Sequence, residues 1–277
     1  MNYYNEIKSE LINNEITKRT KDYSKNKSDL NTYYNVGKLL SEAGKHYGEG
    51  IIKEYSKRLT KEVGNGYGIT NLKRMRQFYL LIKKGAPLAH QLTWSNYIEI
   101  LPINNINIVK YYINISINQH LSRNELRERI KNKEYERLPD STKNKLIIEN
   151  KNNDIKDLIK NPILIKNKYN YDNISEKVLQ KLILEDIPSF LKELGNGFTF
   201  IRNEYKIKIG NNYNYIDLLL FNIEFNCYVV IELKVTELKK EHIGQIHVYM
   251  NYIDNSLKTI NQNKTIGIII VKKKINL

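Results

Sequence analysis

The chain has 277 residues and a formal net charge of +15, from 45 Lys and Arg residues against 30 Asp and Glu residues. This length allows two domains, each with its own core, and the positive charge favours a polyanion as partner. An AT-biased composition, rich in Lys, Asn and Ile, is the alternative explanation of that charge. The single cysteine, Cys227, excludes an internal disulfide, and no apolar run is long enough to span a membrane, so we expect a cytoplasmic protein.

Residues 5–137 show apolar residues at helical spacing, which predicts a mainly helical N-terminal domain over residues 1–138. The glycines of residues 64–68 predict a turn between two of these helices. The helix after the turn carries a polar and basic face opposite its apolar stripe, formed by Lys73, Arg74, Arg76 and Gln77. A turn followed by a basic helix is typical of helix-turn-helix DNA-binding proteins, and an ordinary solvated helix face is the alternative.

Residues 139–170 are rich in Asn, Lys and Asp and predict a linker. The pattern then changes to mixed helix and strand over residues 171–277. We expect a helix over 175–194, strands over 198–209, 213–221 and 226–234, a helix over 237–255 and a last strand over 265–271.

Two acids and a lysine interrupt the apolar strands of this C-terminal domain. Asp217 lies in one expected strand, and Glu232 and Lys234 share a face of the next strand. Charged groups inside apolar strands are unfavourable unless they are paired or bind a metal ion. The pattern therefore predicts a Mg²⁺ or Mn²⁺ nuclease centre, with Asp217, Glu232 and the backbone carbonyl of Leu233 as metal ligands and Lys234 beside the attacking water. The exposed end of a strand is the alternative interpretation.

Gln245 and Tyr249 are four residues apart in the following helix, so they share one of its faces. That face is in a position to line the cleft beside the metal and to bond a phosphate or a ligating carboxylate. Simple packing of Tyr249 is the alternative.

The chain resembles the YhcG-type proteins of the PD-(D/E)xK nuclease superfamily over nearly its whole length. In the C-terminal half the resemblance lies in residues 190–200, 215–219 and 230–234, and in Gln245 with Tyr249. In the N-terminal half it lies in residues 64–68, 71–79, 91–97 and 135–138.

This resemblance implies an α/β restriction-endonuclease-like core preceded by a mainly α-helical, winged-helix-like N-terminal domain. It implies a bacterial Mg²⁺-dependent DNA endonuclease with Asp217, Glu232 and Lys234 as the catalytic set, and it matches Gln245 and Tyr249 to a Gln-x-x-x-Tyr element of related nucleases. DNA is the expected partner, together with proteins of restriction loci or mobile elements. Double-strand cutting by one site per chain favours a homodimer.

The chain departs from the family pattern at three places. Ile216 replaces the proline that precedes the first acid, and Gln180 stands near the place of a glutamate on the first helix of the core, with Glu176 and Glu185 as the nearest acids. The chain also ends at Leu277, earlier than the resemblance leads us to expect, which indicates a C-terminally truncated copy. The alternative function is therefore a catalytically inactive DNA-binding or partner-docking protein with a nuclease fold, and a nuclease acting on RNA is a third.

Overall fold

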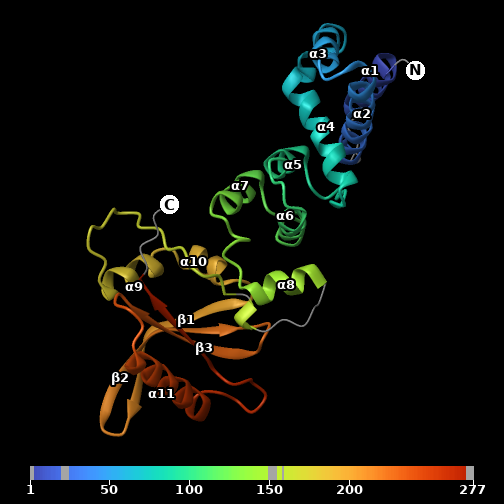
Figure 1. Ribbon diagram of the computed structural model, residues 1–277. Coiled ribbons are helices and arrows are strands. Elements are labelled where there is room, and N and C mark those ends of the chain that lie inside the picture. Colours follow the sequence, from blue (N-terminus) through green and yellow to red (C-terminus); the bar gives the residue numbers. More distant parts are fainter. Residues whose placement is uncertain (1–2, 20–24, 149–154, 158, 273–277) are drawn as a thin grey trace. The chain divides into compact units, whose positions relative to one another are not determined.

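The computed structural model describes residues 3–19, 25–148, 155–157 and 159–272 (Figure 1). The chain divides into two compact units, Met1–Glu136 and Arg137–Leu277. In the part of the chain that is described, no helix is long and apolar enough to cross a membrane.

The first unit is helical, as the sequence predicts. Its helices are α1 (Tyr3–Arg19), α2 (Lys25–Tyr47), α3 (Ile51–Glu62), α4 (Ile69–Lys83), α5 (Trp94–Ile100), α6 (Ile106–Asn118) and α7 (Arg123–Lys131), with a short 3-10 helix η1 (Asn65–Tyr67) in the turn before α4. The described residues of this unit contain no strand to form a wing, so the winged-helix-like expectation is not confirmed.

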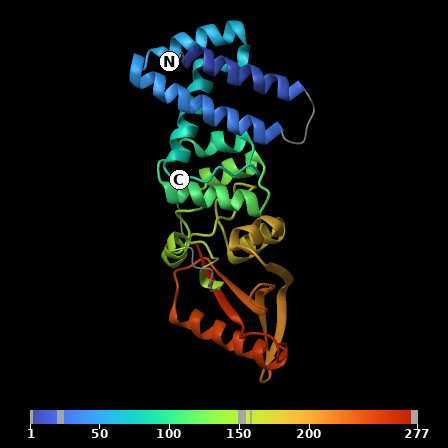
Figure 2. The same cartoon turned by 90° about the vertical axis from the view of Figure 1, so that its right-hand side faces the viewer.

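The long helix α2 packs against both α1 and α4, and Figure 2 shows α1 and α2 lying side by side. The contact between α2 and α4 is closest at Gly37. A Cβ atom added there would lie 2.1 Å from the carbonyl oxygen of Met75. Because such a separation is far inside van der Waals contact, the two helices approach this closely only with glycine at position 37.

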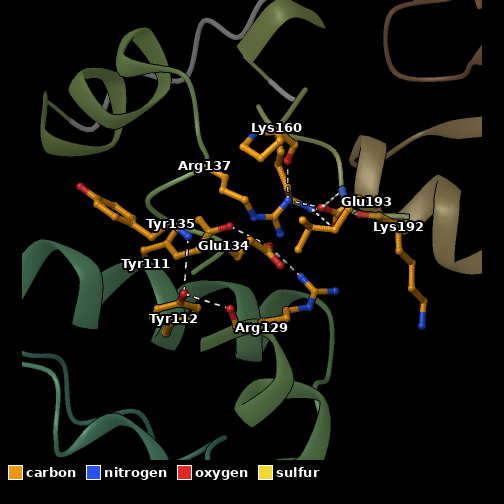
Figure 3. A network of polar contacts seen from close by, with 11 residues as sticks. Tyr111, Tyr112, Arg129, Glu134, Tyr135, Arg137, Lys160, Lys192 and Glu193 are labelled. Carbon is orange, nitrogen blue, oxygen red and sulfur yellow. Dashed lines mark hydrogen bonds and ion pairs between the residues drawn. The ribbon is translucent and has the colours of Figure 1, made fainter. Parts of the chain in front are cut away.

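A buried polar network closes the C-terminal end of the first unit (Figure 3). The Tyr111 hydroxyl donates to Glu134 at 2.9 Å, and the Arg129 guanidinium lies 3.2 Å from the same carboxylate. The Tyr112 hydroxyl donates to the Arg129 carbonyl at 3.3 Å. These bonds satisfy polar groups that would otherwise be costly to bury.

The second unit has a four-stranded sheet with helices on both faces. Its elements are α8 (Asp140–Ile148), η2 (Ile155–Asp157), α9 (Glu176–Leu184), α10 (Ile187–Leu194), β1 (Phe198–Ile209), β2 (Asn212–Asn222), β3 (Cys227–Lys234), α11 (Lys240–Ser256) and β4 (Ile266–Val271). The strand order is β1-β2-β3-β4, antiparallel except for the parallel pair of β3 and β4. The chain crosses from β3 to β4 through α11, which covers one face of the sheet, while α9 and α10 cover the other (Figures 1 and 2). The strands and the helix α11 lie within a few residues of the predicted ranges.

The single helix predicted over residues 175–194 is wrong, because the chain turns between α9 and α10. Asp186 is the N-cap of α10, and its carboxylate accepts from the backbone N–H of Ser189 at 3.3 Å. Pro188 lies in the first turn of α10, a position that proline tolerates well at the start of a helix. The apolar spacing runs through this break, which explains why periodicity alone does not reveal it.

The segment predicted as a linker, residues 139–170, falls inside the second unit and contributes to its core. Ile155 is buried in the cluster beneath β2 and β3, and Ile159, Ile163 and Ile165 pack against that cluster. Figure 3 shows Arg137 directed toward Glu193 of α10, with which it forms an ion pair. Glu193 also accepts from the backbone N–H of Leu164 at 3.1 Å. The polar composition of this segment therefore conceals apolar residues that anchor it to α10 and the sheet.

Candidate active site

The site begins where β2 separates from β3. Their backbone pairing runs from Asn222 opposite Cys227 to Leu218 opposite Ile231 and ends there. At the next position the Asp217 carboxylate accepts a hydrogen bond from the backbone N–H of Leu233 at 2.7 Å. A side chain thus takes the place of a backbone partner, and it fixes Asp217 against the segment of β3 that carries Glu232 and Lys234.

Glu232 is the most unusual group of the site because it is a carboxylic acid with only 2% of its surface exposed. One oxygen, Oε2, accepts from Lys234 Nζ at 3.2 Å, whereas Oε1 is buried with no hydrogen-bond partner among the described residues. Burial, followed by the nearby charge of Asp217, raises the pKa of Glu232 to about 7. Burial also raises the pKa of Asp217, although the hydrogen bond from Leu233 opposes this. Both acids therefore carry an ionisation cost that a cation would relieve.

Lys234 lies among several carboxylates. Besides its contact with Glu232, its Nζ is 4.0 Å from Glu176 on α9. Burial lowers the pKa of Lys234, but the charges of Glu232, Glu176 and Asp217 outweigh that effect and raise it. The ammonium group is therefore held in its charged form at the centre of the acidic cluster.

The helix α9 supplies two further groups. Gln180 donates from its side-chain nitrogen to the backbone carbonyl of Asp217 at 3.3 Å. Glu185, the other acid considered from sequence, lies 3.8 Å from Lys181 in its own helix. Among the acids of α9 and its C-cap, the one beside Lys234 is thus Glu176, while Gln180 supports the backbone of β2.

The structure brings Gln245 and Tyr249 of α11 into contact with each other. Gln245 donates from its side-chain nitrogen to the Tyr249 hydroxyl at 2.8 Å. Tyr249 is buried in the apolar cluster between α11 and the sheet, and burial together with the charge of Glu232 raises its pKa, against the opposing effect of Gln245. Tyr249 accordingly packs in the core, near enough to the acidic site for the charge of Glu232 to affect its pKa.

The donors present fit a small divalent cation. Mg²⁺ is usually held by one or two carboxylates and leaves its other positions to water and substrate, and two carboxylates are present together with the carbonyl of Leu233. The buried Oε1 of Glu232, which has no partner, is an oxygen of this kind. A larger cage of three or more Asp, Glu, His or Cys side chains is absent from the described residues.

One acid near the site escapes sequence analysis. Glu204 lies in β1 opposite Asp217, between the pairs that join Asn203 to Leu218 and Tyr205 to Ile216. Its φ of 46° is in the left-handed region, two residues after the register shift of β1 between Phe200 and Arg202, and its charge raises the pKa of Asp217. No sequence signal marks this residue, because its placement depends on the local distortion of β1.

The basic face expected on α4 is only partly free. Lys73 and Gln77 are exposed and lie one helical turn apart. Arg76 instead forms a two-bond ion pair with Glu49, in which Nη2 lies 2.7 Å from the carboxylate, and Arg74 is half-buried. Lys73 and Gln77 are therefore the two expected DNA-binding residues that point to solvent.

Comparisons with known proteins match both units. Residues 156–277 match the YhcG PDDEXK nuclease domain, and residues 9–137 match the DUF1016 N-terminal domain. A relative from Escherichia coli (strain K12), which bears the name "Putative nuclease YhcG", is 24% identical over 286 residues, covering 88% of this chain and 76% of that protein. No solved structure matches the chain. Both domains match in this order, and the structure gathers Asp217, Glu232 and Lys234. The chain therefore belongs to the YhcG-type family of the PD-(D/E)xK nuclease superfamily.

Proposed function

We propose that this chain is a Mg²⁺- or Mn²⁺-dependent endonuclease that hydrolyses phosphodiester bonds of DNA. The observation that carries this proposal is the hydrogen bond from Leu233 to Asp217, which holds two carboxylates and a lysine together where β2 leaves β3. Support comes from the buried Glu232 oxygen without a partner and from the match to a nuclease domain.

Each side chain has a distinct role in this proposal. Asp217, Glu232 and the Leu233 carbonyl hold the cation, which when bound supplies a more acidic water and positive charge near the phosphate. Lys234 directs its ammonium group toward the scissile phosphate and offsets the negative charge that builds there in the transition state. Gln245 and Tyr249 hold each other in place and offer a hydrogen-bond donor at the edge of the site.

The helical unit is proposed to bind DNA through the exposed part of α4. Lys73 is the cation of this face that points to solvent, and Gln77 extends the same face by one turn. The ion pair with Glu49 holds Arg76 against the turn between α2 and α3 and leaves that arginine a positioning role. DNA is therefore the proposed partner, and cutting of both strands by one site per chain would require two copies.

The test is cleavage of supercoiled, linear, single-stranded and branched DNA with Mg²⁺ or Mn²⁺, with RNA in parallel. Wild type is compared with Lys234→Ala and Asp217→Asn. We expect metal-dependent cutting that falls by at least about a hundredfold in both variants, while DNA binding in EDTA is retained. Lys234→Ala removes the positive charge that offsets the charge on the phosphate, and Asp217→Asn removes a charged ligand of the cation. Cutting that survives Lys234→Ala would refute the assignment of the site.

The alternative of an inactive DNA-binding or partner-docking protein rests on one observation. On α9, Gln180 is bonded to the backbone of Asp217, where the family pattern leads us to expect an acid. Retained DNA binding without cutting of any substrate would favour this alternative.

A further inference from the structure

The hairpin of β1 and β2 carries a compact patch of lysines and tyrosines. In the strand register Lys206 lies opposite Tyr215, and Lys208 lies opposite Tyr213. Residues directly opposite each other in an antiparallel pair project to the same face, as do residues two apart in one strand. The four side chains, which we call the hairpin patch, therefore share one face. Figure 1 shows this hairpin as the orange loop at the lower left, beside the label β2.

Both rings of the hairpin patch are open to solvent. Tyr213 is 57% exposed and Tyr215 is 53% exposed, and both lysines are exposed as well. Lys206 Nζ lies 3.9 Å from the centre of the Tyr213 ring, so the cation and one ring are already in contact. Side chains that project to the other face of the hairpin, such as those of Ile207 and Ile216, are buried against α11. The core therefore fixes the hairpin and leaves the tyrosines outside it.

The general preferences of strands and surfaces do not explain why these tyrosines and lysines gather on one face of the hairpin. Tyrosine is common in strands, and single exposed apolar side chains occur on every protein surface. Here two exposed rings and two lysines are contiguous, and the tyrosines lie on β2, the strand that carries Asp217, while the lysines lie on β1 beside it. Tyr215 precedes that acid by two residues, which corresponds to about 7 Å along a strand. Lys206 is likewise two positions after Glu204, the acid opposite Asp217, so the patch adjoins the acidic site.

The chemistry of the patch selects one class of ligand. Exposed rings stack against nucleic-acid bases, and lysines follow the phosphates of the same strand. In a duplex the bases are stacked on one another and their faces are not available. We propose that the hairpin patch binds unpaired nucleotides beside the scissile phosphate, and that the preferred substrate is DNA with a single-stranded segment. This inference deepens the proposed nuclease function and rests on it.

The test measures binding without catalysis. Anisotropy of a labelled oligothymidylate of about 15 nucleotides, and of a duplex of equal length, is recorded in EDTA for the full chain. The double variant Tyr213→Ala with Tyr215→Ala should weaken single-strand binding by about 25-fold or more, since stacking on an aromatic ring contributes at least about fivefold per base. The corresponding double Phe variant keeps both rings and should bind as wild type does. Duplex affinity should stay unchanged in both.

Two further variants sharpen the test. Tyr169→Ala removes another tyrosine of the second unit, 55% exposed, and should leave single-strand binding unchanged. The double variant Lys206→Gln with Lys208→Gln should lower the slope of log affinity against log salt by about 1.4, from about 0.7 for each single-strand phosphate contact. Thermal melting of every variant checks that the fold is intact.

The outcomes separate this inference from the proposed function. Wild-type single-strand binding by the double Ala variant would overturn the inference, and so would an equal loss of duplex binding. Failure of the proposed function has a different signature: no DNA is cut, whereas single-strand binding still depends on the two rings.

Discussion

Glu232 shows how a single buried carboxyl group couples the stability of the fold to the chemistry of the site. Its raised pKa results from burial and from the charge of Asp217, and one of its oxygens has no partner among the described residues. Protonation removes the buried negative charge, whereas ionisation leaves a charge that the nearby ammonium group of Lys234 offsets only in part. The group is thus suited to exchange a proton for a cation near neutral pH.

This property predicts a pH dependence of stability in the metal-free protein. Because the folded pKa of about 7 lies above the ordinary value of 4.5, the unfolded chain loses this proton first as pH rises. The contribution of Glu232 to the free energy of unfolding is then fully present below about pH 4.5 and is lost as pH rises to about 7, by on the order of 3 kcal/mol. Urea unfolding in EDTA from pH 5 to pH 8 measures this loss.

The control for this prediction is Glu232→Gln, which keeps the shape of the side chain and cannot ionise. Its free energy of unfolding should fall much less between pH 5 and pH 8 than that of wild type. An identical fall in both proteins would assign the pH dependence to another group.

At the scale of elements, regular patterns were predictable and local interruptions were not. Alternating apolar and polar residues and short apolar runs predict the strands β1, β2 and β3. Pairing of consecutive strands then brings Asp217 near Glu232 and Lys234. The break at Asp186 and the anchoring of Ile155 depend on capping and tertiary packing, which periodicity does not report. The placement of Glu204 depends on a distortion of β1, for which the sequence carries no sign.

The contact between α2 and α4 yields a prediction at the same scale. Gly37→Ala places a methyl group 2.1 Å from the Met75 carbonyl oxygen, so one helix has to shift. Overpacking of this kind typically costs about 1–3 kcal/mol, and we expect the melting temperature of the helical unit to fall by several degrees. Gly66→Ala is the matched control, since a Cβ at position 66 meets no atom within 4 Å. Equal melting temperatures for the two variants would contradict the close approach.

At the scale of the molecule, each unit has a core of its own and a separate proposed task. The helical unit carries the exposed basic face of α4, and the second unit carries the acidic site and the hairpin patch. The family matches divide the chain at nearly the same place, with residues 9–137 in one domain and residues 156–277 in the other. DNA affinity and cleavage should therefore respond to different substitutions.

Charge reversal at Lys73 tests this separation. Lys73→Glu should weaken duplex binding and lower the slope of log affinity against log salt by about 0.9, because one phosphate contact is lost. Cleavage at saturating DNA should keep its rate. Lys110→Glu, an equal change of charge at an exposed position of α6, is the control. An unchanged slope for Lys73→Glu would move the DNA-binding face away from α4.

The hydrogen bond between Leu233 and Asp217 has a consequence for how this site can be altered. Since the carboxylate occupies the place of a strand partner, it closes the sheet at its fork and presents a negative charge with the same two oxygens. Replacement by alanine would remove both together and leave the Leu233 N–H without this acceptor, whereas asparagine keeps an acceptor for that N–H and discards only the charge. Loss of activity in this chain can therefore proceed through Asp217→Asn with the architecture intact, whereas an apolar residue at position 217 would silence the site and also leave a buried N–H of β3 without this partner.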